Sequence, residues 1–255
     1  MTPSLPDVFL RVPLAHRALH DLSAGRPENS RAAVRAAIAA GYGIEIDLQQ
    51  SADARAMVFH DTTLDRLAEG SGPVRARSAA DLAQVPLRGG HEGIPDLAEV
   101  LDLVSGQVPL LIEIKDQDGA MGPAIGPLEQ AIALALAGYA GPVAVMSFNP
   151  HSVARMAELC PEIPRGLVTD AFEARDWTLP EETRARLRGV PDYWDLGCSF
   201  ISHNMHDLAR PRVAALKAEG AAVLCWTVRS PEDEAQARSV AQNITFEGYK
   251  PPLDA

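Results

Sequence analysis

The stretch Gly43-Ile44-Glu45-Ile46-Asp47-Leu48 is a β-branched run behind a Gly-Tyr-Gly sequence, a pattern that predicts a strand. Side chains alternate between the two faces of a strand, so Glu45 and Asp47 share one face, opposite the isoleucines and Leu48. Two neighbouring carboxylates repel each other unless a cation or a proton lies between them. A strand with one solvated face is the alternative, and the flanking segments distinguish the two interpretations.

A strand and a helix precede this stretch. The short apolar run Val12–Ala15, which ends just before His16, is predicted to be the first strand. Apolar residues at helical spacing predict a helix over Arg31–Ala40, with Asn29 or Ser30 as its N-cap. The chain therefore begins with a strand–helix–strand unit.

The segment after the acidic strand changes direction. Ala56–Phe59 is another strand-like run, and only Gln49–Arg55 separates it from the acidic strand. A parallel crossover needs about a dozen residues or more, so the spacing predicts an antiparallel hairpin with its turn near Asp53-Ala54. Such a hairpin returns His60 to the neighbourhood of Asp47.

The region after the hairpin has no long periodic helix. Residues 62–93 are rich in glycine, arginine and short apolar clusters, which favours an irregular excursion. We therefore expect residues 49–95 to form a hairpin and a small insertion.

The remaining chain alternates between strands and helices. The helices predicted after the insertion are Leu97–Val104, Leu128–Ala137, Val153–Leu159, Glu181–Leu187, Arg212–Glu219 and Pro231–Val240. Apart from the hairpin arm, the strands are Val12–Ala15, Gly43–Leu48, Leu110–Lys115, Pro142–Met146, Arg165–Val168, Cys198–Ser202, Ala222–Val228 and Asn243–Phe246. Eight such units in about 250 residues predict a (β/α)8 TIM barrel, as a single domain over residues 1–255. A two-domain doubly wound sheet is the alternative, but no glycine-rich phosphate fingerprint supports it.

Composition limits the partners. The chain has 47% hydrophobic and 22% charged residues, typical of a soluble globular protein. Its net charge of −11 argues against nucleic acid or an anionic membrane surface as the main partner. We expect no signal peptide, because the N-terminus lacks a basic stretch followed by an apolar core of about 7–15 residues. We expect no stable membrane insertion, because no apolar run approaches the roughly 20 residues of a spanning helix. The three cysteines are odd in number and far apart, which suits buried thiols and a cytoplasmic location. A homo-oligomer is compatible with all of this.

Polar side chains gather where the predicted strands end, which is the active-site face of such a barrel. They are His16, Arg17, Glu45, Asp47, His60, Glu113, Lys115 and, near the end of the seventh barrel strand, Trp226. Three carboxylates suit a hard divalent cation such as Mg²⁺ or Ca²⁺. An arginine and a lysine suit a phosphate, and two histidines allow one general acid and one general base. Together these groups describe metal-assisted attack on a phosphodiester.

The order of short motifs resembles the glycerophosphodiester phosphodiesterase family, a branch of the phospholipase-C-like barrels. The motifs are His16-Arg17, Pro27-Glu28-Asn29-Ser30, Glu45-x-Asp47, His60-Asp61, Ile94-Pro95-x-Leu97-x-Glu99-Val100-Leu101, Ile112-Glu113-Ile114-Lys115, Ser147-Phe148 and Trp226-Thr227-Val228. The resemblance implies Glu45, Asp47 and Glu113 as metal ligands, His16 and His60 as the acid/base pair, and phosphate contacts from Arg17 and Lys115. It also implies attack on phosphorus by the glycerol 2-hydroxyl, followed by hydrolysis of a cyclic phosphate to glycerol 3-phosphate. Water as the nucleophile is the alternative, and either histidine can be the acid.

Two positions depart from the family pattern. Ala18 stands where the family usually has a glycine, a substitution that costs free energy if the backbone there needs a positive φ. The closing motif, usually Thr-Asp-x-Pro, reads Thr245-Phe246-Glu247-Gly248.

Simpler interpretations stand beside the functional ones. Arg17 and Lys115 could form plain salt bridges with the carboxylates, and Trp226 could be ordinary packing rather than a wall of the glycerol pocket. Asp61 could orient a histidine or cap a turn. Two rival functions are a lysophospholipase-D or sphingomyelinase-D-like enzyme, which would need an exposed apolar rim, and a non-catalytic binder of glycerophosphodiesters.

Overall fold

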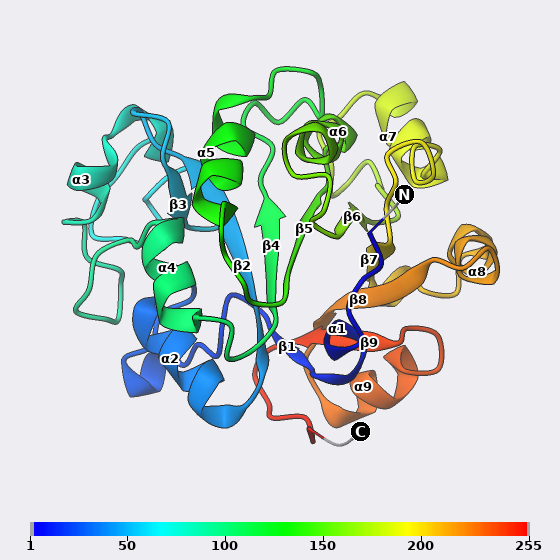
Figure 1. Cartoon of the computed structure of the whole chain (residues 1–255), viewed down its shortest axis with the longest axis horizontal. Helices are drawn as coiled ribbons and strands as arrows, with labels where there is room; N and C mark the ends of the chain where they lie inside the picture. The colour runs from blue at the N-terminus through cyan, green and yellow to red at the C-terminus, as the bar shows by residue number, and fades with distance from the viewer. Residues whose placement is uncertain (1–2, 254–255) are drawn as a thin grey trace.

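The computed structural model describes residues 3–253, and a nine-stranded sheet organises them. Its strands are β1 (Leu14–Ala15), β2 (Gly43–Gln50), β3 (Ala56–Val58), β4 (Leu110–Ile114), β5 (Val143–Ser147), β6 (Arg165–Thr169), β7 (Phe200–Asn204), β8 (Ala222–Val228) and β9 (Asn243–Phe246). All of them except β3 pair in parallel, in the order β1-β9-β8-β7-β6-β5-β4-β2, and β1 also pairs with β2, so the sheet closes on itself. The predicted TIM barrel is confirmed (Figure 1).

Most helices alternate with the strands around the outside of this barrel, while the first packs on the cluster in its interior and the third lies in the excursion after the hairpin (Figure 1). They are α1 (Val8–Arg11), α2 (Arg31–Ala40), α3 (Ala79–Leu82), α4 (Leu97–Val104), α5 (Pro127–Leu136), α6 (Pro150–Leu159), α7 (Glu181–Gly189), α8 (Pro211–Ala218) and α9 (Pro231–Ala237), with short 3-10 turns at Leu22–Ala24, Val74–Ala76 and Met205–Asp207. Within residues 3–253, no helix combines the length and the apolar character needed to cross a bilayer.

The hairpin after β2 forms as predicted. β3 runs antiparallel to β2, with Leu48 opposite Val58, and Ala54 at the turn adopts a positive φ of 56°. The backbone N–H of Phe59 donates to the Asp47 carbonyl at 2.9 Å, so the chain delivers His60 beside the acidic strand. The excursion that follows contains α3 and packs on its own cluster of buried apolar side chains, which includes Met57 and Leu82.

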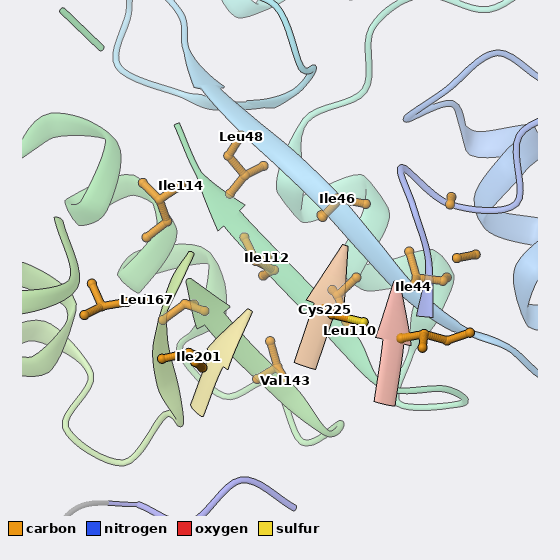
Figure 2. Close-up of a cluster of buried hydrophobic side chains, with 14 of the residues drawn as sticks. Ile44, Ile46, Leu48, Leu110, Ile112, Ile114, Val143, Leu167, Ile201 and Cys225 are labelled. Carbon is orange, nitrogen blue, oxygen red and sulfur yellow. The ribbon is translucent and has the colours of Figure 1, made fainter. Parts of the chain in front are cut away.

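Apolar residues fill both sides of the barrel wall. Ile44, Ile46 and Leu48 of β2 point outward to the helices, together with side chains of the neighbouring strands (Figure 2). A second cluster fills the barrel interior, and Phe9 of α1 packs into it. The side chains of β2 therefore alternate as predicted. Apolar side chains lie on the outer face, and the two acids lie on the face that points into the barrel.

Element ends differ from the predictions by a few residues, for identifiable reasons. β1 begins at Leu14 because Pro13 has no N–H to donate to a neighbouring strand. α6 begins at Pro150 rather than Val153, because the Asn149 side chain caps it by accepting from the His151 N–H.

We predict that Gly166→Ala destabilises the barrel. A Cβ at Gly166 in β6 would lie 2.5 Å from Cε2 of Phe200 and 2.6 Å from its carbonyl oxygen, so the backbones of β6 and β7 must separate. Such overpacking costs about 1–3 kcal/mol in the free energy of unfolding, measurable by urea denaturation. Gly122→Ala, where an added Cβ meets nothing within 4 Å, is the matched control and should be near neutral. Equal stability of the two variants would contradict the packing argument.

Candidate active site

The carboxyl ends of the barrel strands surround a cavity of about 180 Å³. Its lining residues are His16, Arg17, Glu45, His60, Glu113, Lys115, Met146, Phe148, Trp226, Thr227, Arg229 and Thr245. Seven of the eight residues singled out in the sequence line this cavity, and the eighth, Asp47, is buried against the Lys115 ammonium. The fold thus brings together side chains from four strands and the hairpin.

Three carboxylates form the acidic centre of the site. β2 and β4 are parallel neighbours with Asp47 opposite Glu113, and Glu45 lies two residues earlier on the same face of β2. One carboxylate oxygen from each of Glu45, Asp47 and Glu113 lies within 4.8 Å of the others, and all three side chains are buried. Oxygen ligands converging in this way suit a hard divalent cation.

The carboxylates differ in how their charge is compensated. Burial, followed by repulsion from Asp47 and Glu113, raises the pKa of Glu45 well above its usual range. Burial also acts on Asp47, but the positive charge of Lys115 is the main opposing cause and holds the pKa of Asp47 below its usual range. The Glu45 carboxylate accepts a single hydrogen bond, from the backbone N–H of Arg17 at 2.9 Å. The acidic centre therefore fits an additional cation, because the Glu45 charge is left largely uncompensated.

Lys115 and Arg17 are the cations beside this centre. Lys115 Nζ lies 2.7 Å from Asp47 Oδ1 and donates to Glu113 Oε1 at 2.6 Å. The contact between Lys115 and Asp47 is an ion pair without hydrogen-bond geometry. The buried Oδ1 of Asp47 therefore accepts no hydrogen bond. Arg17 donates to Glu28 at 2.7 Å, and its Nε lies 3.6 Å from Asp47 Oδ2. Both cations therefore form salt bridges with the carboxylates, as the simpler interpretation of the sequence predicted. Both also line the cavity.

His16 follows β1 and is held by Glu247. Its Nδ1 lies 2.6 Å from Glu247 Oε2, and its backbone N–H donates to the Phe246 carbonyl at 2.9 Å. Burial lowers the pKa of His16, and the hydrogen bond that His16 donates to Glu247 opposes that shift. His16 therefore meets the cavity as a largely neutral imidazole with one nitrogen already engaged.

His60 is held in the same manner by its neighbour. His60 Nδ1 lies 2.7 Å from Asp61 Oδ1, so Asp61 orients a histidine rather than capping a turn. Arg66 donates to both Asp61 oxygens, at 2.6 and 2.8 Å, and also reaches Glu28, the partner of Arg17. Burial lowers the pKa of His60 as well.

A strained turn connects His16 to the acidic centre. Arg17 and Ala18 both have positive φ, 53° and 63°, which costs about 1–2 kcal/mol for each non-glycine residue. The Ala18 N–H donates to the Glu45 carbonyl at 2.9 Å, and the Arg17 carbonyl accepts from Asn29 N–H at 2.9 Å. The conformation explains why a glycine would suit position 18, and these hydrogen bonds hold it without one.

Trp226 belongs to an aromatic wall that lines the cavity. Its ring centroid lies 5.7 Å from that of Phe148, which also contacts Trp177 and Phe172. The Trp226 indole donates to the Ser202 carbonyl at 3.0 Å. This wall contrasts with the charged side of the cavity.

Two residues beside the site carry contacts that the sequence did not predict. Asn29 was a candidate helix cap or loop brace. Its amide nitrogen instead donates to Asp47 Oδ2 at 2.9 Å, while Ser30 caps α2. Glu247 was noted only as a departure from the closing motif. The Pro-Glu-Asn-Ser motif was the one signal that pointed to Asn29, and no local pattern pointed to Glu247.

His203 is a further buried histidine, outside the candidate site. It lies on β7, is 2% exposed, and bonds to Thr169 and Asp207. It is absent from the cavity lining.

Comparisons with known proteins agree with this geometry. The family model described as glycerophosphoryl diester phosphodiesterase family matches residues 16–243. A glycerophosphodiester phosphodiesterase of Caldanaerobacter subterraneus subsp. tengcongensis is 26% identical, over 81% of this chain and 82% of its own length. One from Bacillus subtilis is 28% identical, over 72% of this chain and 71% of its own length. Among solved structures, an Oleispira antarctica phosphodiesterase in complex with the product sn-glycerol 3-phosphate matches with a TM-score of 0.76 at 25% identity, covering 94% of this chain and 93% of that one.

We predict that Glu45→Gln stabilises the protein when divalent cations are removed. Because the pKa of Glu45 is raised in the folded state, the folded chain binds more protons than the unfolded chain above the ordinary value of 4.5. Stability should therefore fall as the pH rises from that value through the raised pKa, and the full cost is present above it. A neutral glutamine removes this cost, so the variant should melt a few degrees higher than wild type in EDTA at pH 8. Glu234→Gln, which removes a carboxylate bonded to Arg238 at 2.7 Å, is the control and should show no gain. A lower melting temperature for Glu45→Gln at pH 8 would refute the prediction.

Proposed function

This chain belongs to the glycerophosphoryl diester phosphodiesterase family and is an enzyme of that class, and on that premise we propose how its residues hydrolyse a glycerophosphodiester. The products are sn-glycerol 3-phosphate and an alcohol. His16 and His60 form the acid/base pair, and Glu45, Asp47 and Glu113 hold a divalent cation. The substrate is a small molecule, in keeping with the product bound to the Oleispira relative.

One observation carries this proposal. His16, His60, Arg17, Lys115 and two members of the carboxylate cluster line one cavity of about 180 Å³. Each histidine has its Nδ1 engaged by a carboxylate, so the same nitrogen, Nε2, is free on both rings. Two proton carriers beside a cation site and two positive side chains suit phosphodiester cleavage.

The positive side chains bind the phosphate. Arg17 presents a planar fork to phosphate oxygens, and Lys115 a point charge. The carboxylates of Asp47 and Glu28 raise the pKa of Arg17 against the effect of burial, so its charge is retained. The Phe148 and Trp226 wall packs against the carbon skeleton of the substrate and excludes water from that side.

The histidines move the protons. One imidazole takes the proton from the attacking hydroxyl, which is the glycerol 2-hydroxyl or water, as the new P–O bond forms. The other imidazole, protonated, donates to the leaving alcohol oxygen as the old P–O bond breaks. If the glycerol 2-hydroxyl attacks, water then opens the cyclic phosphate with the two roles reversed, which returns both imidazoles to their starting states. If water attacks directly, both imidazoles return to those states by exchanging a proton with solvent.

The cation ligands are Glu45, Asp47 and Glu113, which together favour oxygen-seeking Mg²⁺ or Ca²⁺. When bound, such a cation acts as a Lewis acid toward phosphate oxygens. Asn29 holds Asp47 in place by donating to its second oxygen.

The rival functions receive less support. The exposed large apolar side chains of the described chain, which would be needed to receive an acyl group, lie outside the cavity lining; they are Leu22, Leu134, Trp194 and Leu253. A non-catalytic binder would have no use for two oriented histidines. The proposal includes a single domain over residues 1–255, in which the hairpin and insertion at 49–95 supply His60. The cytoplasmic location and any homo-oligomer stay predictions.

The first test of function is release of glycerol 3-phosphate from glycerophosphocholine. We expect turnover by wild type and at least about 10²-fold lower kcat in His16→Ala and in His60→Ala, because each removes one proton carrier. His151→Ala, on the exposed side of α6, is the control and should keep full activity. Full activity in either active-site variant would overturn the acid/base assignment, and binding without turnover by wild type would favour the binder.

The second test concerns the cation. EDTA-treated protein should bind Mg²⁺ or Ca²⁺ in calorimetric titration, and Glu113→Gln should weaken that affinity at least about tenfold, because a neutral amide replaces a charged ligand. Activity lost in EDTA should return on adding the cation. Glu234→Gln serves again as control. Unchanged affinity in Glu113→Gln, or full activity after exhaustive chelation, would show that the reaction does not use this cation site.

A further inference from the structure

Glu247 is a carboxylate at the edge of the site that the family motif does not predict. Its side chain is about one-fifth exposed, and its Oε2 lies 2.6 Å from His16 Nδ1. It comes directly after β9, at the third position of the closing motif, which is the variable position of the Thr-Asp-x-Pro pattern. It is the strongest polar contact made by His16.

The barrel backbone fixes both partners of this contact. β1 pairs in parallel with β9, with Ala15 opposite Phe246, so His16 and Glu247 are the next residues in the same register. His16 N–H donates to the Phe246 carbonyl at 2.9 Å, and Glu247 N–H donates to the Val228 carbonyl at 3.0 Å. The two side chains therefore start from anchored backbones, and the contact does not depend on a mobile loop.

Arg229 fixes the orientation of the carboxylate. Its Nε donates to Glu247 Oε1 at 2.8 Å, which leaves Oε2 for His16. His20 Nε2 is 3.6 Å from the same oxygen, too far for a hydrogen bond. The hydrogen bond from His16 also holds the pKa of Glu247 well below its usual range, so the group stays ionised.

An ionised carboxylate can only accept a hydrogen bond, so the ring nitrogen facing it must carry the hydrogen. His16 is then the Nδ1–H tautomer, and its Nε2 has a free lone pair. We propose that Glu247, clamped by Arg229, is a positioning residue that holds His16 in the tautomer and orientation needed for proton transfer through Nε2. The proposal rests on the acid/base role of His16 proposed above.

The second histidine shows the same arrangement from unrelated parts of the chain. His60 meets Asp61 Oδ1 through Nδ1, and Arg66 donates to both Asp61 oxygens, including the one that His60 contacts. Two separate histidine–carboxylate–arginine sets around one cavity argue that the arrangement serves the histidines and is more than a surface ion pair.

The decisive experiment compares Glu247→Gln and Glu247→Asp with wild type in the glycerophosphocholine assay. Glu247→Gln should lower kcat by about 10²-fold, in the direction seen when the orienting carboxylate of a catalytic histidine is neutralised, while KM changes less than about threefold. Glu247→Asp keeps the charge and should recover a large part of kcat. In the His16→Ala background, Glu247→Gln should cost nothing further, because the two residues act as one unit.

A spectroscopic measurement reports the tautomer without relying on activity. In ¹H–¹⁵N correlation spectra of the imidazole nitrogens, the signals missing from His16→Ala identify His16. They should show hydrogen on Nδ1 in wild type and a shift toward Nε2 hydrogen in Glu247→Ala. Glu234→Gln is the control for loss of a part-buried ion-paired carboxylate, and should change neither the spectrum nor kcat.

The outcomes separate this inference from the proposed function. Full activity of His16→Ala would refute the acid/base role itself. An inactive His16→Ala, together with wild-type kcat in Glu247→Gln and an unchanged His16 tautomer in Glu247→Ala, would refute only the positioning role. A loss of kcat matched by an equal rise in KM, with the tautomer unchanged, would also overturn it.

Discussion

Repulsion among three buried carboxylates is the constraint on which the site depends. Glu45, Asp47 and Glu113 lie on adjacent parallel strands and within 4.8 Å of one another, where their charges cannot be solvated. Lys115 compensates two of them, and the Asn29 amide holds the outer oxygen of Asp47. The Glu45 carboxylate remains uncompensated apart from one backbone N–H, so the geometry of the cluster suits a divalent cation.

The barrel backbone brings these charges to one place. Parallel pairing sets Asp47 opposite Glu113, and closure of β1 onto β9 sets His16 opposite Glu247. The antiparallel arm adds His60 without disturbing the parallel order. Strain is stored next to the site, in the positive φ of Arg17 and Ala18, and the hydrogen bonds of that turn to β2 hold it in place.

The cavity lining divides into charged groups and aromatic rings. Arg17, Lys115 and the two oriented histidines belong to the first kind, and Phe148 and Trp226 to the second. A substrate with an anionic phosphate and a short carbon skeleton matches this division. Arg17 and Lys115 supply local positive charge in the cavity, so the net charge of −11 does not exclude an anionic ligand there.

The amino-acid sequence by itself determined the alternation of strands and helices, the hairpin and the family, because these depend on local periodicity and on ordered short motifs. The sequence also predicted the cluster of Glu45, Asp47 and Glu113. Strand period two puts Glu45 and Asp47 on one face, and the predicted barrel brings Glu113 to the same end. Only the tertiary structure determined that Glu247 holds His16 and that Asn29 holds Asp47. Those contacts join residues far apart in the chain through strand register and side-chain reach, and neither leaves a periodic signal along the sequence.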